Sequence, residues 1–310
     1  KPMPKSSSST PAISVQKVSN TYADGFKAVK NVSFSIMPGD FTVLLGLNGA
    51  GKTSLISMIN SLSHISSGQI TIDGYDVIKD SYQAKQRLGV VPQEINFNPF
   101  LTVMDTLYYH GGFFGTPREQ VLRVAKPLLQ KARLWSKRDT DIGSLSGGMK
   151  RMLMLIRALV HEPSVLILDE PTANLDIEIR DTIWDILKSY RKQNLTILLT
   201  THNLMEAQEL CDNLLILHHG TLMRNQSIHE AIMSLQERFY AVTFTQAFTK
   251  RQLKNLAYTT IDDKQIVLQL TQDDSLSDSI QHLTAQGLEV ADLTRSSNQL
   301  EQLLRQATAK

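Results

Sequence analysis

The sequence lacks the features that mark secreted and membrane-spanning proteins. Its 310 residues include one cysteine, Cys211, which excludes an internal disulfide framework and favours a reducing compartment. No apolar run approaches the roughly 20 residues that cross a bilayer, and the runs 165–168 and 197–199 have the length of strands. Lys1 and Lys5 are not followed by an apolar segment, so we expect no signal peptide and no direct membrane span.

An excess of charge of either sign is also missing. Lysine and arginine number 32 and the acidic residues 30, so the net charge of +2 gives no electrostatic reason to expect a nucleic acid as the main partner. The chain is 42% hydrophobic and 20% charged, as in an ordinary globular protein. The length suits one large domain with a smaller one.

One glycine-rich stretch organises the chain. Residues 46–53, GLNGAGKT, fit the phosphate-binding pattern G-x-x-x-x-G-K-[ST]. The preceding residues 41–45 indicate a buried strand and 54–60 the first turns of a helix, which is the context that the pattern requires. A chance glycine-rich turn is the alternative, and these flanks argue against it.

The chemistry of this loop follows from its residue types. The glycines let several backbone N–H groups approach a polyphosphate, and the helix N-terminus adds a partial positive charge. We expect Lys52 to reach the β- and γ-phosphates and the Thr53 hydroxyl to ligate Mg²⁺. The ATP-binding residues predicted on this loop are Gly46, Leu47, Asn48, Gly49, Ala50, Gly51, Lys52, Thr53 and Ser54.

Two carboxylates follow a second buried strand. Residues 165–168 are apolar and lead into Asp169 and Glu170, the pattern that holds Mg²⁺ in P-loop ATPases. Asp169 is predicted to hold the metal through water, and Glu170 to act as general base on the attacking water. A solvated Asp-Glu turn is the alternative. His202 ends the next predicted strand, from where it can reach the γ-phosphate, although a lone histidine is more often structural.

Two further features are ambiguous from spacing alone. Residues 145–148, LSGG, precede a strong helical pattern and form another anion-binding helix terminus, a weak signal in isolation. Tyr22 lies in a turn between two alternating strands, 13–18 and 32–36. Its ring can stack on adenine or pack within the hairpin, and both interpretations stay open here.

Seven features occur in the order and spacing of the ABC ATPases, which this sequence resembles from about residue 13 to 227. In chain order they are Tyr22, the loop 46–53, Gln93, the segment 145–148, the segment 165–170, Asp176 and His202. More closely, the sequence looks like the separate ATPase subunit of bacterial ABC exporters of the multidrug, polysaccharide and Nod-factor class. The segments that carry this closer resemblance are 91–100, 200–207 and 210–212.

The resemblance implies a shared active site. Two subunits would meet head to tail, each ATP held by the phosphate loop of one and by the 145–148 segment of the other. That segment consists of Leu145, Ser146, Gly147 and Gly148. Tyr22 would stack on adenine, Asp176 would communicate across the dimer, and His202 would position the γ-phosphate. Gln93 would sense Mg²⁺ and the γ-phosphate and link to the membrane subunit, which makes Thr53, Gln93 and Asp169 the expected metal residues.

The same resemblance implies ATP and Mg²⁺ as cofactors, a homodimer, and an integral-membrane permease as partner. The subunit would sit on the cytoplasmic face of a bacterial inner membrane and drive export. The helices between Gln93 and Ser146 would receive the permease's coupling helix. The chain departs from the family at Leu47, where proline is usual, and at Asn174, where glycine or alanine is more usual.

We expect an α/β fold: a P-loop ATPase core with a mixed sheet, flanking helices and a helical subdomain at about 94–159. The predicted divisions are a disordered tail 1–11, an ATPase domain 12–227 and a small α+β accessory domain of ferredoxin-like type at 228–310. Pro127 predicts a kink or a break within a helix at 119–132. In the accessory domain we predict strands 239–244, 265–270 and 288–293 and helices 246–256, 275–286 and 297–307. A structural or dimer-stabilising role is expected there, with ligand sensing as the alternative.

Three other functions have sequence requirements that can be checked. A soluble ABC protein acting on ribosomes or DNA needs two cassettes or a long coiled coil, and a GTPase switch needs an Asn-Lys-x-Asp loop; the sequence contains none of these. A catalytically dead scaffold is argued against by Lys52, Asp169, Glu170 and His202.

Overall fold

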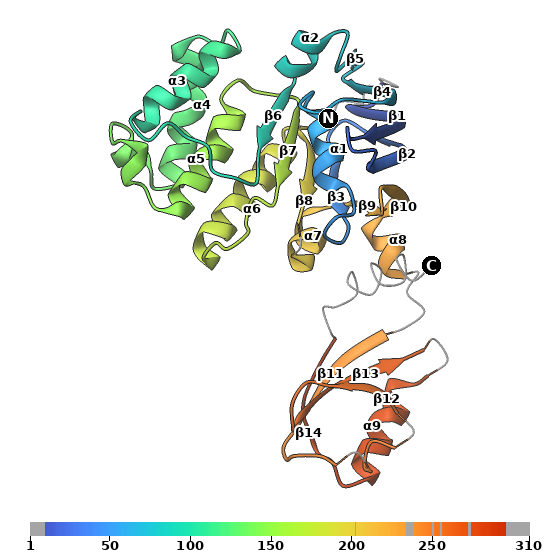
Figure 1. The fold of residues 1–310 in the computed structure, drawn as a ribbon. Helices are drawn as coiled ribbons and strands as arrows, with labels where there is room; N and C mark the ends of the chain where they lie inside the picture. Colours follow the sequence, from blue (N-terminus) through green and yellow to red (C-terminus); the bar gives the residue numbers. More distant parts are fainter. Residues whose placement is uncertain are drawn as a thin grey trace, which may run out of the picture. The chain divides into compact units, whose positions relative to one another are not determined.

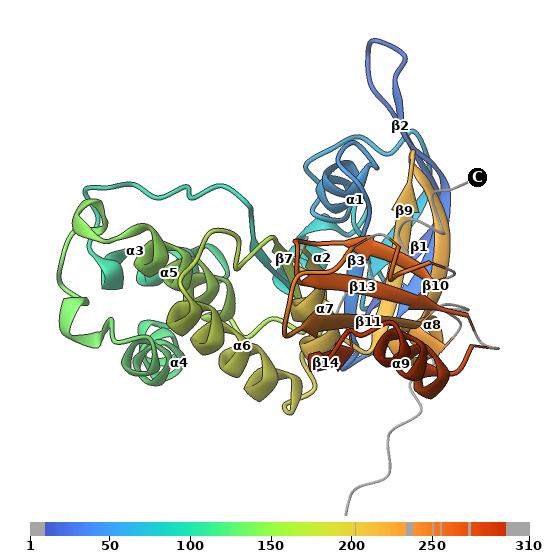
Figure 2. The same cartoon turned by 90° about the horizontal axis from the view of Figure 1, so that it is seen from below.

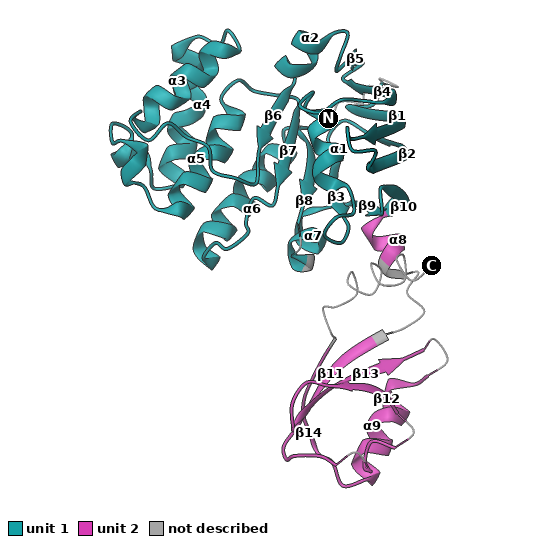
Figure 3. Cartoon of the chain, viewed as in Figure 1, with its two compact units in different colours: residues 1–226 teal, residues 227–310 magenta. Residues whose placement is uncertain are grey.

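The chain divides into two compact units, residues 1–226 and 227–310 (Figure 3). The computed structural model describes residues 10–201, 203–233, 238–249, 251–254, 256–271 and 274–295. The predicted tail 1–11, except for its last two residues, and the predicted helix 297–307 lie outside this described part. The two units have separate hydrophobic cores.

The first unit begins with an antiparallel sheet in the order β2-β1-β4-β5 (Figure 1). Strand β1 (Ile13–Thr21) pairs with both β2 (Lys27–Ile36) and β4 (Ser67–Ile72). The short β5 (Tyr75–Asp76) pairs with β4. Apolar residues alternate along β2, so one face of this sheet is buried and the other is polar.

A second sheet of six strands, in the order β10-β9-β3-β8-β7-β6, forms the centre of the unit. Its central strands β3 (Phe41–Leu45) and β8 (Thr196–Thr200) are buried at every position. The neighbours β6, β7, β8, β3 and β9 all run parallel. The remaining members are β6 (Leu88–Val91), β7 (Val165–Asp169), β9 (Asn213–His218) and β10 (Thr221–Ser227). Parallel strands covered on both faces read as continuous apolar runs, which is why 165–168 and 197–199 stand out in the sequence.

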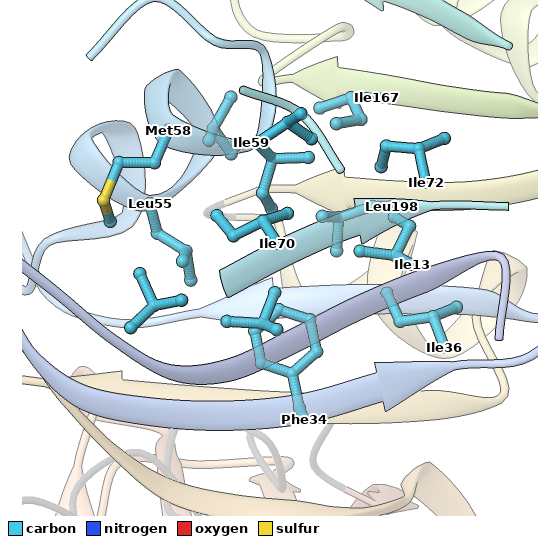
Figure 4. Close-up of a cluster of buried hydrophobic side chains, with 14 of the residues drawn as sticks. Ile13, Phe34, Ile36, Leu55, Met58, Ile59, Ile70, Ile72, Ile167 and Leu198 are labelled. Carbon is cyan, nitrogen blue, oxygen red and sulfur yellow. The ribbon is translucent and has the colours of Figure 1, made fainter. Parts of the chain in front are cut away.

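Helix α1 (Lys52–Ile59) packs its apolar side into the core that joins the two sheets (Figure 4). Leu55, Met58 and Ile59 of this helix lie against side chains from both sheets. Among the latter are Ile13, Ile70, Ile167 and Leu198, each at most 1% exposed. The helix that follows the phosphate loop is therefore fixed by its apolar face, and its N-terminus is held in place.

Three helices gather at one end of the first unit, away from the antiparallel sheet (Figures 1 and 2). They are α3 (Val103–Phe113), α4 (Arg118–Lys131) and α5 (Gly147–Leu159). Two 3-10 turns, at Trp135–Lys137 and Ile142–Ser144, lie between α4 and α5. The other helices of this unit are α2 (Ser81–Gln86), α6 (Ile177–Arg191) and α7 (Leu204–Leu210).

Helix α4 is continuous through Pro127, so the alternative of two shorter helices is wrong. The proline is exposed, while Val121, Ala125 and Leu129 of the same helix are fully buried. A proline removes one helical hydrogen bond, and on the solvent side water can satisfy the carbonyl that is left without its donor. Burial of the apolar stripe then outweighs the local cost.

The second unit contains a four-stranded antiparallel sheet in the order β12-β13-β11-β14. Its strands are β11 (Arg238–Phe244), β12 (Ala257–Thr260), β13 (Gln265–Leu270) and β14 (Val290–Arg295), with α9 (Leu276–Ala285) between the last two. Numbered within the unit and read from β14, the order is 4-1-3-2, that of a ferredoxin-like sheet. A short helix α8 (Ile228–Met233) precedes the sheet in the sequence.

The predicted helix 246–256 is wrong. Its described residues form bends and turns, and the strand β12 that follows was not predicted. Leu253 from these turns is 1% exposed and packs into the core of the unit, and Phe248 and Leu256 pack against the same core. Gln252 ties the segment down by accepting from the Thr249 backbone N–H at 2.9 Å. Strand β12 has no buried residue, and its alternation is therefore too weak to detect.

Truncation of the core should destabilise the first unit strongly. Ile167 is fully buried between the sheets, so we expect Ile167→Ala to lower the free energy of unfolding by about 2–5 kcal/mol. Both tryptophans lie in this unit, and their fluorescence during urea unfolding measures the loss. Ile78→Ala is the matched control, because Ile78 is 62% exposed and its truncation should change stability by about 0.5 kcal/mol or less. Equal losses in the two variants would contradict the packing described here.

Candidate nucleotide-binding site

The phosphate loop joins the end of β3 to the start of α1. Gly51 caps the helix with a φ of 101°, a left-handed conformation that favours glycine. A Cβ atom at this position would lie 2.4 Å from the carbonyl oxygen of Ala28, so a side chain has no room. Leu47 is half exposed, and its backbone carbonyl accepts from the Ala50 N–H at 3.0 Å. The departure from proline at Leu47 therefore leaves the loop hydrogen bonding intact.

Lys52 is folded over its own loop. Its Nζ donates to the carbonyl oxygens of Gly46 at 2.7 Å and Leu47 at 3.3 Å, and the side chain is buried. Burial lowers the pKa of Lys52, and the nearby carboxylates of Glu170 and Asp169 act in the opposite direction. The Lys52 ammonium group is thus held beside the cavity by two backbone carbonyl groups, which carry no net charge and which an anion can replace.

A cavity of about 480 Å³ brings together Lys52 and Glu170, two of the three predicted catalytic residues. Gln93, Asp169 and Glu170 border it opposite the loop residues 48–54. Phe26 and Ala28 border it as well. Among the described residues that were predicted to bind ATP, Tyr22, Gly46 and Leu47 are not part of this lining.

The two carboxylates lie at the carboxyl end of β7, beside the end of β8. Asp169 accepts a hydrogen bond from the Thr200 hydroxyl. The Glu170 N–H donates to the Thr200 carbonyl at 3.0 Å, and Gln93 Nε2 donates to Glu170 Oε2 at 3.3 Å. Glu170 has a φ of 50°, which is uncommon for a residue other than glycine and is associated with functional sites. The backbone hydrogen bond of Glu170 and the side-chain amide of Gln93 together orient the Glu170 carboxylate.

The residues around the cavity fit Mg²⁺. In the described part of the chain no cluster of three or more histidine, cysteine or acidic residues could form an all-protein metal cage. Mg²⁺ does not need one, because it takes one or two carboxylates, keeps several waters and binds substrate phosphates. Thr53, Gln93 and Asp169 offer oxygen ligands around the same cavity as the phosphate loop. They would hold the ion together with a nucleotide.

The segment 145–148 does not border this cavity. Ser146 is the exposed N-cap of α5, and its hydroxyl accepts from the Met149 N–H at 3.3 Å. Gly148 packs against α6, where an added Cβ would lie 2.3 Å from Ile179 Cδ1. Asp176 is likewise exposed, at the start of α6. Within one chain these predicted site residues therefore stay apart from the phosphate loop.

His202 lies outside the described residues, and its neighbours Thr201 and Asn203 border a second cavity of about 500 Å³ that also reaches Glu170. Asn174 has a φ of 57°. Asparagine tolerates this left-handed conformation better than most residues, which explains how it can stand where the family more often has glycine.

Arg151 is a site residue that the sequence analysis missed. It lies on the buried side of α5, and its guanidinium donates to the carbonyl oxygens of Pro92 at 2.8 Å and Gln93 at 2.6 Å. The helix that begins at Ser146 is therefore tied to the backbone of Gln93. The one signal in the sequence is a basic residue on a helix face whose other members, such as Leu155 and Ala158, are apolar.

Glu206 was missed as well. The capping pattern Asn203-x-x-Glu206 suggests that this side chain folds back onto its helix N-terminus. Instead it is fully buried and accepts from Thr172 Oγ1 at 2.8 Å and Trp184 Nε1 at 2.9 Å. It connects α7 to α6 and to the turn after Glu170, and no local pattern reveals these distant partners.

Comparison with known proteins agrees with this arrangement. Residues 29–173 match the family model described as ABC transporter. The chain is 43% identical over 206 residues to Nod factor export ATP-binding protein I of Burkholderia lata, covering 66% of this chain and 68% of that one. It is 41% identical over 225 residues to the protein of the same name from Rhizobium etli, covering 72% and 71%.

Two solved structures share the fold. An ATP-binding subunit of an ABC transporter superposes with a TM-score of 0.68 at 27% identity, covering 72% of this chain and 92% of that one. The protein cbiO1 from Clostridium perfringens gives 0.64 at 27% identity, covering 73% and 92%. The predicted fold class is confirmed, as are the enzyme class, an ATPase, and the cofactors ATP and Mg²⁺, which are those of the family. By its motifs, its fold and these relatives, the chain belongs to the ATP-binding proteins of the ABC transporter family.

Proposed function

We propose that this subunit hydrolyses ATP in the cavity between its phosphate loop and Glu170, and that it uses the cycle to drive a membrane permease for export. One observation carries the chemical part of the proposal: Lys52, Gln93, Asp169 and Glu170 border a single cavity of about 480 Å³. A phosphate-binding loop and a positioned carboxylate facing one another are what transfer of a phosphoryl group to water requires.

Each residue has a distinct task in this proposal. Lys52 exchanges its carbonyl contacts for the β- and γ-phosphates and offsets their negative charge. Mg²⁺, when bound with ATP, adds further charge neutralisation. Glu170 accepts the proton of the attacking water, and the hydrogen bond from Gln93 holds its carboxylate in orientation. His202 is proposed to position the γ-phosphate.

The dimer is proposed from what the cavity lacks. Ser146 and Gly147 are exposed and do not border the cavity of their own chain, although they form a helix terminus suited to anions. A second copy, arranged head to tail, would bring this terminus to the γ-phosphate. Asp176, exposed at the start of α6, would then lie near the same boundary.

The permease is proposed to dock on an apolar groove of about 380 Å³. Tyr82 of α2 and Phe113 of α3 line it and are 70% and 83% exposed, an arrangement that suits the apolar face of a short helix. Relatives are named for Nod factor export, and cbiO1 is described as part of the complex cbiONQ. None of the described helices combines the length and apolarity needed to cross a membrane. From the relatives, we propose a separate membrane partner and a location on the cytoplasmic face of the bacterial membrane.

Removal of the general base should separate ATP binding from turnover. Glu170→Gln keeps the shape of the side chain but cannot accept the proton, so we expect kcat to fall by about 10²–10⁴-fold while ATP still binds. Phosphate release and calorimetry measure the two properties. With ATP, the variant should also elute as a dimer from a sizing column.

The matched control for this experiment is Glu119→Gln, an exposed glutamate on α4 away from the cavity. It should hydrolyse ATP at the wild-type rate. A kcat for Glu170→Gln within a factor of two of the control would contradict the role assigned to Glu170.

Mixing two inactive variants should restore activity if the site is shared. Ser146→Arg places bulk and charge where the partner's γ-phosphate would sit, and Lys52→Ala removes the cation from the subunit's own loop. Either variant alone should be nearly inactive. In a mixed dimer one site carries both lesions and the other carries neither, so ATPase activity should return as subunits exchange.

Mixed dimers of wild type and Lys52→Ala, isolated through a different affinity tag on each subunit, control for subunit exchange and for turnover by one intact site. If those mixed dimers are active and the two variants show no rescue at any ratio, the head-to-tail dimer is wrong. A site contained within one subunit would show no rescue, because each variant would then lack a necessary group in every site.

A further inference from the structure

The turn between β1 and β2 presents an exposed phenylalanine to the nucleotide cavity. Phe26 is 59% exposed, yet it borders the cavity together with Ala28 and the phosphate loop. A single exposed apolar residue needs no explanation by itself. Its position on the rim of a polar cavity, beside a second exposed aromatic residue, makes Phe26 informative.

The second aromatic residue is Tyr22, and the turn holds the two rings as a pair. The Tyr22 N–H donates to the Phe26 carbonyl at 2.9 Å, and the Gly25 N–H donates to the Tyr22 carbonyl at 2.9 Å. The rings stack with their planes 18° apart and their centroids separated by 6.5 Å. The Tyr22 hydroxyl forms a 2.9 Å hydrogen bond with that of Ser54, in the first turn of α1. One ring is thus attached to the phosphate-binding helix, and the other is attached to the first by the turn.

A base inserted between the rings sets the spacing that they must reach. Optimal contact between stacked carbon atoms is about 3.5 Å, so a flat base between two parallel rings needs roughly 7 Å between the ring planes. The centroids lie 6.5 Å apart, which is the upper limit for the separation of the planes, so the base enters only when the turn opens. Tyr22 directly follows β1 and Phe26 directly precedes β2, so the turn can open by movement of Phe26 while Tyr22 keeps its hydrogen bond to Ser54.

We propose that Tyr22 and Phe26 form an aromatic clamp that holds the nucleotide base between their two rings. This rests on the proposed nucleotide site, to which it adds Phe26 as a binding residue and a preference among bases. Stacking depends on the area of the base and not on its edges. ATP and GTP should consequently bind alike, whereas the smaller pyrimidine of CTP covers less of both rings and binds more weakly.

The proposal is tested by comparing ligands with and without a base. For Phe26→Ala we expect the Kd for ATP to rise about tenfold, a typical loss for one stacked base, while the Kd for magnesium tripolyphosphate stays at the wild-type value. Phe26→Tyr should bind ATP as wild type does, because it keeps the ring. Phe26→Ala should also reduce the preference for ATP over CTP. Phe100→Ala is the matched control, since Phe100 is 85% exposed and does not line the cavity.

The outcomes separate the clamp from the site on which it rests. An unchanged Kd for ATP in Phe26→Ala, with a loss in Tyr22→Ala, would leave Tyr22 as the sole stacking ring and overturn the clamp. Equal losses for ATP and tripolyphosphate would place the effect in the phosphate loop and overturn it as well. ATP binding that Lys52→Ala does not weaken would instead contradict the nucleotide site itself, whatever Phe26 does.

Discussion

The site depends on the parallel pairing of buried strands in the central sheet. Leu44 of β3 pairs with Thr200 of β8, and Asp169 of β7 pairs with the same residue from the other side. Because parallel strands end at the same edge, the phosphate loop after β3 and the carboxylates after β7 meet there. Strand β8 lies between β3 and β7, and its Thr200 hydroxyl donates a hydrogen bond to Asp169. Register in this sheet therefore determines whether the loop and Glu170 face one another.

A few buried polar side chains then secure what the strands bring together. Arg151 holds the backbone of Gln93, and Glu206 holds Thr172 and Trp184. Each is a buried charged group whose partners are distant in the sequence. Removal of one partner in such a contact leaves an uncompensated polar group and is strongly destabilising. These contacts give the loops around the cavity fixed positions despite their lack of regular structure.

The sequence predicts best those features that depend on residues close together in the chain. The phosphate loop, the strand before Asp169 and the helix at α9 are determined by neighbouring residues, and their patterns predicted them. Arg151 and Glu206 act on residues that the fold brings near, and a single sequence does not specify such contacts. The helix predicted at 246–256 is wrong for a related reason, since Phe248, Leu253 and Leu256 pack against a core formed by residues distant in the sequence. The roles of the site residues stay predictions, because proximity around a cavity does not establish what each group does.

Helix α5 relates the proposed site to the proposed permease groove. It begins at Ser146, and through Arg151 it holds the segment that carries Gln93. Two residues beyond its end, His161 stacks on Phe114 with 3.8 Å between ring centroids, and Phe114 lines the groove. Burial lowers the pKa of His161 to about 4, so near neutral pH its ring is uncharged and packs as an apolar group.

Helix α5 thus has three connections. Its N-terminus is the one offered to the partner's phosphate, and its Arg151 holds Gln93, the residue that orients Glu170. The chain just beyond its C-terminal end packs against a wall of the groove. A helix transmits displacement along its axis because its own hydrogen bonds keep it stiff, whereas a loop would absorb it. In the proposed cycle, engagement of Ser146 by the second subunit's nucleotide would move this helix as one body. Gln93 and the groove would then respond together, which is the property required of an ATPase that drives a separate membrane partner.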